Sequence, residues 1–374
     1  MTHSKQASAP RAAGRLRSAL LLLGLATIGA ISGYLLANLT EWMGFVPALD
    51  LSGGQLIALL LLLLPIWFLV VLAHEAGHLA GGMLAGFKPF QLVVGPLKLL
   101  WVEGRVRAEL NRSLLLAGGV AVSLPPDGHN LIRRMLLMVV GGPAGSLLLA
   151  LLALVAMAFA DGLTAAALLV ATGLGLSITI ITLVPMRSGG FYSDGARILM
   201  LLRGGPQAER WSAVALLLNA SLAGRLRELD AALVARATAL RDGTLDAVSA
   251  AFMAYSVELT LGDVVAAGAQ LDYTLANLEV YPAAFRPAIL VEAAYFTARH
   301  RGDAVAARAY LEQIAGAAPL VEPYTRRRAE AAVLLAEGRI EESRAAAEAG
   351  LAAIERAQIG TLGAFDAELL AELR

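Results

Sequence analysis

The run from Leu56 to Ala73 contains eighteen consecutive residues without a charge, and it constrains the fold more than any other feature of the sequence. A helix needs about twenty predominantly apolar residues to cross the hydrocarbon core of a bilayer. The run continues directly into the sequence AHEAGH, which places His74, Glu75 and His78 at the end of a predicted membrane span. Because a charged side chain costs about 3 kcal/mol at the centre of a membrane helix, such residues usually mark a functional site.

Three further apolar stretches are long enough to span a membrane: residues 18–39, 135–160 and 163–186. We therefore expect an all-α polytopic membrane protein with about four transmembrane helices, formed by residues 18–203 after a basic cytoplasmic arm at residues 1–17. The composition agrees, since only 16% of the residues are charged whereas a soluble domain usually has about a quarter. The first stretch is longer than the apolar core of a secretory signal, which favours a span that the chain retains.

Lysine and arginine are concentrated in alternate segments between the predicted spans. The N-terminal arm, residues 87–134 and the residues after the fourth span are rich in these bases, whereas the loop around Glu41 and Asp50 has none. Because basic segments stay on the cytoplasmic side, both termini and the histidine end of the second span should be cytoplasmic. The heavy use of Ala, Leu, Gly and Arg is typical of GC-rich prokaryotic genomes, so we expect a protein of the inner (cytoplasmic) membrane.

The sequence contains no cysteine, which excludes disulfides, iron–sulfur clusters and thiolate zinc sites. Histidine, aspartate and glutamate are the strong metal ligands that remain. The thirty basic and thirty acidic residues balance, so the chain has no overall basic field of the kind that binds nucleic acid.

His74 and His78 are four residues apart, so both can lie on one face of a helix and bind one metal ion. Glu75 projects from nearly the same side and can act as a general base on a water at that metal. Two histidine ligands and a carboxylate base form the zincin pattern, and it predicts one zinc ion per chain. Two other roles remain open for these side chains: a polar contact between helices, and a proton relay in a transporter.

A catalytic zinc site needs a third protein ligand. Asp194, in the sequence LVPMRSGGFYSDGARIL, follows a segment that Pro185 and several glycines should break. Irregular backbone at membrane depth occurs only where it is buried in protein or lines a cavity, so Asp194 is our candidate for the third ligand. Two alternatives remain: Asp194 could be the N-cap of the helix that follows, or His129 could lie near the site.

Together, the sequences HEAGH, VGGPAGSLLLALL and LVPMRSGGFYSDGARIL resemble the motifs of the site-2 protease family of intramembrane zinc metalloproteases. The resemblance covers about residues 56–203. It implies that His74, His78 and Asp194 bind zinc. Glu75 would then be the catalytic base for the hydrolysis of peptide bonds in transmembrane substrate proteins.

The resemblance also implies that the segment around Gly142 and Pro143 lies close to the active site. The chain departs from the usual family pattern in two places. Val184 stands before Pro185 where the family usually has an asparagine, and the spacer from Pro185 to Asp194 is longer than the common Pro-x-x-Asp-Gly form.

Short β-prone runs lie between the second and third predicted spans, within residues 87–131. They read FQLVVG, LKLLWV and GGVAVSLPP. In the family, comparable strands lie beside the active site and can pair with an unwound substrate, whereas the alternative is an ordinary cytoplasmic hairpin.

Residues 206–374 are charged and alanine-rich, which predicts a cytoplasmic α-helical domain. Gly262, Gly302 and Gly338 each separate two predicted helices, at spacings of 40 and 36 residues. These spacings are near the tetratricopeptide length of about 34, so residues 245–356 resemble a divergent helical repeat. Such arrays form protein-binding surfaces, and we expect a protein adaptor to bind here; a plain helical bundle is the alternative.

The sequence as a whole predicts an intramembrane zinc metalloprotease for regulated intramembrane proteolysis, with a helical domain that recruits or gates. The alternative is a membrane scaffold or transporter, in which the histidines are structural or relay protons. Bound zinc distinguishes the two, because the protease needs about one ion per chain and a scaffold needs none.

Overall fold

The computed structural model describes Asn38 and residues 51–102, 104–111, 118–188, 191–314, 321–357 and 363–374. The chain divides into two compact units. The first comprises the residues up to Gly77 together with residues 141–184, and the second comprises residues 78–140 and 185–374. Helices α2 and α3 each contribute residues to both units.

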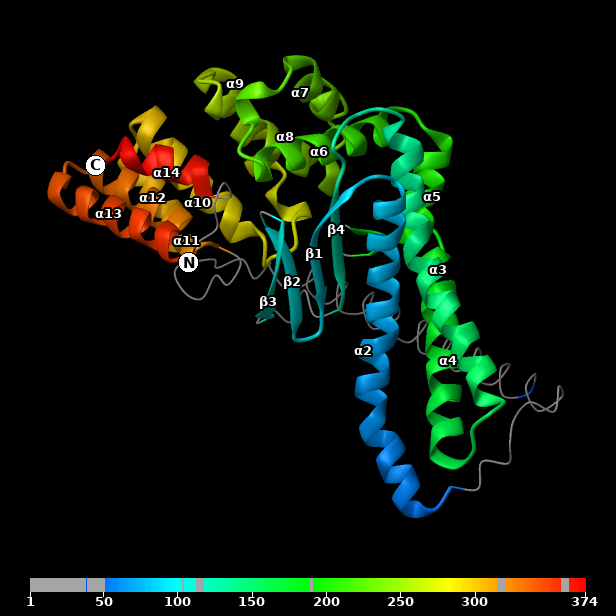
Figure 1. Ribbon diagram of the computed structural model, residues 1–374. Helices are drawn as coiled ribbons and strands as arrows, with labels where there is room; N and C mark the ends of the chain where they lie inside the picture. The colour runs from blue at the N-terminus through cyan, green and yellow to red at the C-terminus, as the bar shows by residue number, and fades with distance from the viewer. Residues whose placement is uncertain are drawn as a thin grey trace, which may run out of the picture. The chain divides into compact units, whose positions relative to one another are not determined.

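Three helices among the described residues are long and apolar enough to cross a membrane (Figure 1). They are α2 (Gly53–Leu84), α3 (Leu131–Met157) and α4 (Gly162–Leu183). Leucines along the first half of α2 are largely exposed, with Leu61 at 74%, which agrees with the predicted membrane span. The helices lie where the second, third and fourth spans were predicted. Apart from Asn38, the predicted first span, residues 18–39, lies outside the described residues.

Helix α3 packs unusually close to α2 because glycines face each other at the crossing. A Cβ atom added at Gly77 would lie 2.2 Å from the carbonyl oxygen of Gly141, and one added at Gly145 would lie 2.3 Å from that of Ala73. Both neighbours are backbone atoms, which cannot rotate away as a side chain can. Small residues at this position allow two backbones to approach, which is how helices associate in membranes.

Four antiparallel strands follow α2 and form a small sheet in the order β3-β2-β1-β4 (Figure 1). They are β1 (Lys88–Val94), β2 (Leu97–Val102), β3 (Arg105–Leu110) and β4 (Val120–Leu124). The three predicted β-prone runs form β1, β2 and β4, so that prediction is confirmed. Strand β3 was not predicted, because its sequence RVRAEL is charged and its side chains are almost all exposed.

A short hairpin and a series of helices complete the second unit. The elements are β5 (Arg187–Ser188), β6 (Phe191–Tyr192), α5 (Asp194–Arg203), α6 (Pro206–Leu222), η1 (Leu226–Glu228), α7 (Ala231–Thr238), α8 (Leu245–Thr260), α9 (Val264–Ala276), η2 (Leu278–Val280), α10 (Arg286–Arg301), α11 (Ala304–Gln313), α12 (Pro323–Ala336), α13 (Ile340–Ala357) and α14 (Ala364–Ala371). Helix α4 ends at Leu183, two residues before Pro185, as the sequence predicts.

Helices α8 and α9, α10 and α11, and α12 and α13 pack as three consecutive pairs (Figure 1). A glycine with positive φ lies in the turn of each pair: Gly262 at 82°, Gly302 at 66° and Gly338 at 79°. Residues with a Cβ rarely adopt this conformation, which explains why glycine occupies each turn. The predicted glycine turns are therefore confirmed.

A buried arginine on α12 connects this helix with α10 and α14. Arg328 on α12 is 0% exposed and forms ion pairs with Glu292 on α10 and with Asp366 on α14, the latter at 3.3 Å between Nε and Oδ1. Burial raises the pKa of Glu292, and the positive charge of Arg328 opposes that rise. The pairing allows these charges to remain in a core built from apolar side chains.

Replacing Gly145 with alanine should lower the melting temperature of the purified protein in detergent, because the new methyl group meets backbone of α2. Overpacking of this kind typically costs about 1–3 kcal/mol. Gly54→Ala is the matched control on α2, since nothing lies within 4 Å of a Cβ there. Alanine also favours helix over glycine, so this control should be neutral or slightly stabilising. A Gly145→Ala variant that melts as high as the control would contradict the close packing.

Candidate metal centre

The two histidines and the glutamate predicted to act together lie in the last third of helix α2. His74 is buried, with 6% of its surface exposed, and Glu75 and His78 are half-buried. Because the helix is continuous through this segment, the spacing of four residues places His74 and His78 on one face.

Asp194 joins the two histidines in a group that could hold a metal ion. One ligand atom from each of His74, His78 and Asp194 lies within 4.8 Å of the other two. The distance from Nε2 of His78 to Oδ1 of Asp194 is 3.4 Å. Two ligands bound at 2.0–2.1 Å in a tetrahedron are about 3.4 Å apart, so this pair already has the separation that a zinc-like ion requires.

Hydrogen bonds from neighbouring residues determine which ring nitrogen each histidine can offer. Nδ1 of His74 lies 2.8 Å from Oγ of Ser146, and Nδ1 of His78 lies 3.1 Å from the carbonyl oxygen of Met138. A carbonyl only accepts, so Nδ1 of His78 is the protonated donor, and in the neutral imidazole Nε2 then keeps the lone pair. Ser146 can accept from Nδ1 of His74 in the same way. Metal-binding histidines are typically held by such a second bond.

The segment that carries Asp194 folds back on itself. Residues Arg187 and Tyr192 pair across the β5-β6 hairpin. Just outside the hairpin, the backbone N–H of Ser193 donates to the carbonyl of Met186 at 3.0 Å, and the N–H of Met186 donates to Oγ of Ser193 at 3.0 Å. The hairpin therefore brings Ser193, and with it the neighbouring Asp194, next to Met186, although nine positions separate Asp194 from Pro185 in the sequence.

Ser193, and not Asp194, is the N-cap of α5. Oγ of Ser193 accepts a hydrogen bond from the N–H of Ala196 at 3.2 Å. The alternative interpretation of Asp194 as the cap is therefore wrong. As the first residue of the helix, Asp194 lies where the positive end of the helix dipole favours a carboxylate.

The other histidine considered for the site lies elsewhere. His129 is exposed in the turn between β4 and α3, where its Nε2 is 3.0 Å from Nδ2 of Asn130. It is not a member of the possible metal-ligand group found among the described residues. In contrast, Gly141 and Gly142 on α3 lie beside Gly77 of α2, between the two histidines. The family resemblance implies that this segment of α3 lies close to the active site.

Two residues that hold the site were not identified from the sequence. Ser146 could have been noticed as a single hydroxyl within the apolar run of α3, in the sequence GPAGSLLLALL. Met138 acts through its backbone carbonyl, which carries no signal in the sequence.

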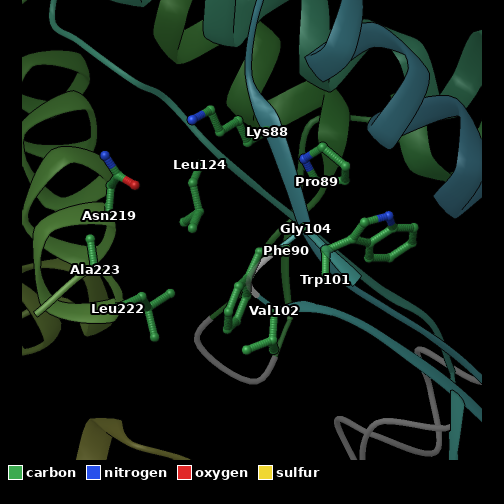
Figure 2. A pocket seen from close by; sticks show the side chains of 10 residues that line it. All are labelled: Lys88, Pro89, Phe90, Trp101, Val102, Gly104, Leu124, Asn219, Leu222 and Ala223. Atoms are coloured by element: carbon green, nitrogen blue, oxygen red, sulfur yellow. The ribbon is translucent and has the colours of Figure 1, made fainter. Parts of the chain in front are cut away.

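A separate groove of about 330 Å³ lies between the sheet and the C-terminal end of α6 (Figure 2). Its lining is Lys88, Pro89, Phe90, Trp101, Val102, Gly104, Leu124, Asn219, Leu222 and Ala223. The described lining is mainly apolar, with one ammonium group and one amide. It offers contact surface rather than the nitrogen and carboxylate ligands that a metal needs.

Asp194→Asn should weaken zinc binding by at least about tenfold, because a neutral amide oxygen is a poorer ligand than a carboxylate. Helix α5 should stay folded, since Ser193 is its cap. Zinc per chain is measured on the purified protein against a competing chelator. Asp230→Asn is the control, because Asp230 caps α7 and asparagine caps equally well. Wild-type zinc affinity in Asp194→Asn would remove Asp194 from the site.

Ser146→Ala should also weaken zinc binding, by about 10–100-fold, because Nδ1 of His74 loses the partner that orients the ring. The same chelator competition measures this effect. Thr172→Val removes another buried hydroxyl, one that donates to the backbone of its own helix α4, and should leave zinc binding unchanged. Equal losses in both variants would show that general packing, and not the orientation of His74, is responsible.

Comparison of the chain with protein-family models, with curated proteins and with solved structures gave no match. The case for a function therefore depends on the residues and geometry described above.

Proposed function

We propose that this protein is an intramembrane zinc metalloprotease of the site-2 protease type, which hydrolyses peptide bonds in transmembrane substrate proteins. The observation that carries the proposal is the His74, His78 and Asp194 group, because its histidines lie on a helix long and apolar enough to cross a membrane. Ligands with this spacing suit a soluble zincin equally well; their position on such a helix favours membrane-embedded substrates.

The hairpin accounts for the unusual spacer between Pro185 and Asp194. Bonds between Met186 and Ser193 close the hairpin, so that residues 187–192 form an insertion. Without the insertion, the chain would read Pro185, Met186, Ser193, Asp194 and Gly195. That order has the Pro-x-x-Asp-Gly form of the family, which supports the resemblance at the place where the sequence alone departs from it.

In the proposed reaction, His74, His78 and Asp194 would hold zinc and Glu75 would be the base. Bound there, zinc would lower the pKa of a water to near 7 and polarise the carbonyl of the substrate. We propose that Glu75, which is half-buried and follows His74 on α2, takes a proton from a water at the site and delivers it to the leaving amine. His74 and His78 keep their tautomers through Ser146 and the carbonyl of Met138, so neither is required to move a proton.

A peptide bond within a helix is shielded, so the substrate must be extended before a water can attack it. Strand β4 is an edge of the described sheet, and its Ser123 lies beside Gly82 of α2. A Cβ at Gly82 would lie 2.8 Å from Oγ of Ser123 on β4, and Gly82 is one helical turn beyond His78. We propose that the substrate segment pairs with this sheet by main-chain hydrogen bonds, as in other cases of strand addition.

We further propose that the three helix pairs of α8–α13 form a divergent tetratricopeptide-like repeat that binds a protein adaptor. Their glycine turns and consecutive packing support this proposal. The distribution of basic residues favours a cytoplasmic location for this domain and for the sheet, in a prokaryotic inner membrane.

Glu75→Gln should abolish proteolysis and leave zinc binding intact, because glutamine keeps the shape of the side chain but cannot take a proton. We expect cleavage to fall by about 10²–10⁴-fold, the usual contribution of a general base. Membrane-protein fragments are compared between cells with wild type and with Glu75→Gln, and zinc is measured on both purified proteins. Glu109→Gln changes an exposed carboxylate on β3 and is the control.

A wild-type protein that binds no zinc would contradict the protease and favour the scaffold or transporter. Zinc binding together with identical fragments in wild type and Glu75→Gln would show that the metal has another role.

A further inference from the structure

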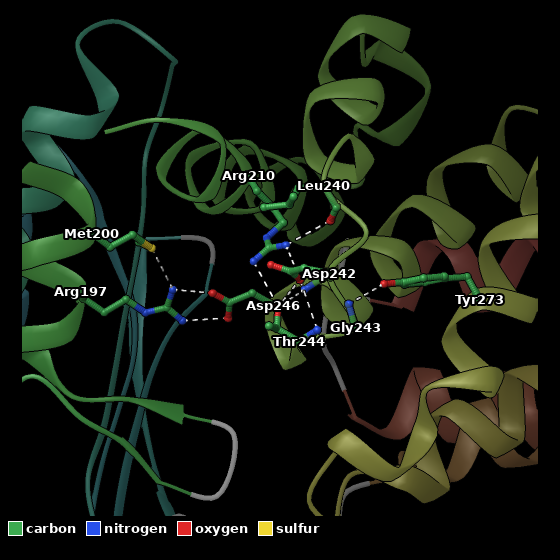
Figure 3. Close-up of polar contacts among 10 residues, drawn as sticks. Arg197, Met200, Arg210, Leu240, Asp242, Gly243, Thr244, Asp246 and Tyr273 are labelled. Carbon is green, nitrogen blue, oxygen red and sulfur yellow. Dashed lines mark hydrogen bonds and ion pairs between the residues drawn. The ribbon is translucent and has the colours of Figure 1, made fainter. Parts of the chain in front are cut away.

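The start of α8 and the residues just before it are bound by arginines from two earlier helices (Figure 3). Arg197 on α5 donates from Nη1 to Oδ2 of Asp246 at 2.7 Å and from Nη2 to Oδ1 at 2.9 Å. Arg210 on α6 donates to Oδ1 of Asp242 at 2.9 Å and to Oγ1 of Thr244, the N-cap of α8, at 3.2 Å. The first helix pair is therefore attached to α5 and α6 through charged groups.

The pair of Arg197 and Asp246 has the features of a strong contact. Both side chains are mostly buried, with 15% and 12% exposed, and the geometry is bidentate. The guanidinium of Arg197 also lies over the rings of Tyr192 and Trp211, at 4.2 and 4.5 Å from their centroids. Two parallel hydrogen bonds and two aromatic faces fix a planar guanidinium in a way that lysine could not reproduce.

This contact lies one helical turn from the proposed zinc ligand. Asp194 and Arg197 are three residues apart on a helix of ten residues, so they lie on neighbouring positions of the same face. Tyr192 belongs to the hairpin that delivers Asp194, so Arg197 holds both sides of the ligand. The neighbouring Phe191 also contacts Phe285, just before α10, with ring centroids 6.4 Å apart.

Helix α9 is hydrogen-bonded to the same segment. The hydroxyl of Tyr273 on α9 accepts a hydrogen bond from the N–H of Gly243 at 3.1 Å, three residues before Asp246. A displacement of the pair, for example by a protein bound to it, would therefore be transmitted to α5 through the ion pair.

We propose that Arg197 is a positioning residue through which the C-terminal helices set Asp194 against His78, so that these helices regulate the metal site. The inference rests on the proposed function, because it assigns to the helical domain the regulation of the same metal site. In this proposal, the contact between Arg197 and Asp246 maintains the distance of 3.4 Å between Nε2 of His78 and Oδ1 of Asp194.

The test measures the zinc affinity of purified full-length protein by chelator competition. Arg197→Gln and Asp246→Asn should each weaken zinc binding about tenfold, in the range found for residues that orient metal ligands. The double variant should be no weaker than either single one, because both remove the same contact. Combining Arg197→Gln with Asp194→Asn should likewise add nothing, since Arg197 acts through Asp194.

Arg308→Gln is the matched control. Arg308 forms a bidentate pair with Glu337, at 2.7 and 2.6 Å, in the same helical domain but away from α5. It should change zinc affinity by less than twofold. Arg197→Lys serves if Arg197→Gln does not fold: it keeps the charge and loses the planar, stacked geometry, and zinc affinity should still fall.

Unchanged zinc affinity in a folded Arg197 variant would overturn the inference, even if the melting temperature falls. The inference would also be overturned if the losses of zinc affinity from Arg197→Gln and Asp194→Asn added together in the double variant, because Arg197 would then act by another route. A loss of zinc affinity in a protein without proteolysis would support the positioning role and reject the protease. A wild-type protein that binds no zinc would overturn both.

Discussion

The close approach of α2 and α3 is the constraint on which the candidate site depends. Without side chains at Gly77 and Gly145, the two backbones come near enough for Oγ of Ser146 to reach Nδ1 of His74 at 2.8 Å. Serine is a short side chain, so a small increase in helix separation would break this bond. The glycines therefore have a chemical role as well as a packing role, since they place a hydroxyl beside a buried imidazole.

A polar side chain within an apolar helix needs a partner, and here the partners also prepare the ligands. The carbonyl of Met138 accepts from His78, and Ser146 is within hydrogen-bonding distance of His74. Each bond occupies Nδ1 and leaves Nε2 for a metal. The same contacts thus reduce the cost of burying the imidazoles and select the nitrogen that binds, which links the stability of this segment to its chemistry.

Asp194, the proposed third ligand, is brought to the site by the β5-β6 hairpin. Residues 187–192 lengthen the chain between Pro185 and Asp194. Hydrogen bonds between Met186 and Ser193 bring the two ends of this segment together. Helix α5, which follows the hairpin, contacts the C-terminal helices where Arg197 meets Asp246.

Much of the fold follows from the sequence alone, because apolar run length, the four-residue histidine spacing and glycine at helix turns are local patterns. Local patterns did not predict β3, whose charged side chains conceal a paired backbone, or the capping of α5 by Ser193 instead of Asp194. Nor did they identify Ser146, which lies 72 residues from its histidine, or Arg197, which lies 49 residues from its carboxylate. Only the tertiary structure decided these contacts, since a hydrogen bond depends on distance in space and its energy is lost within about an ångström of displacement.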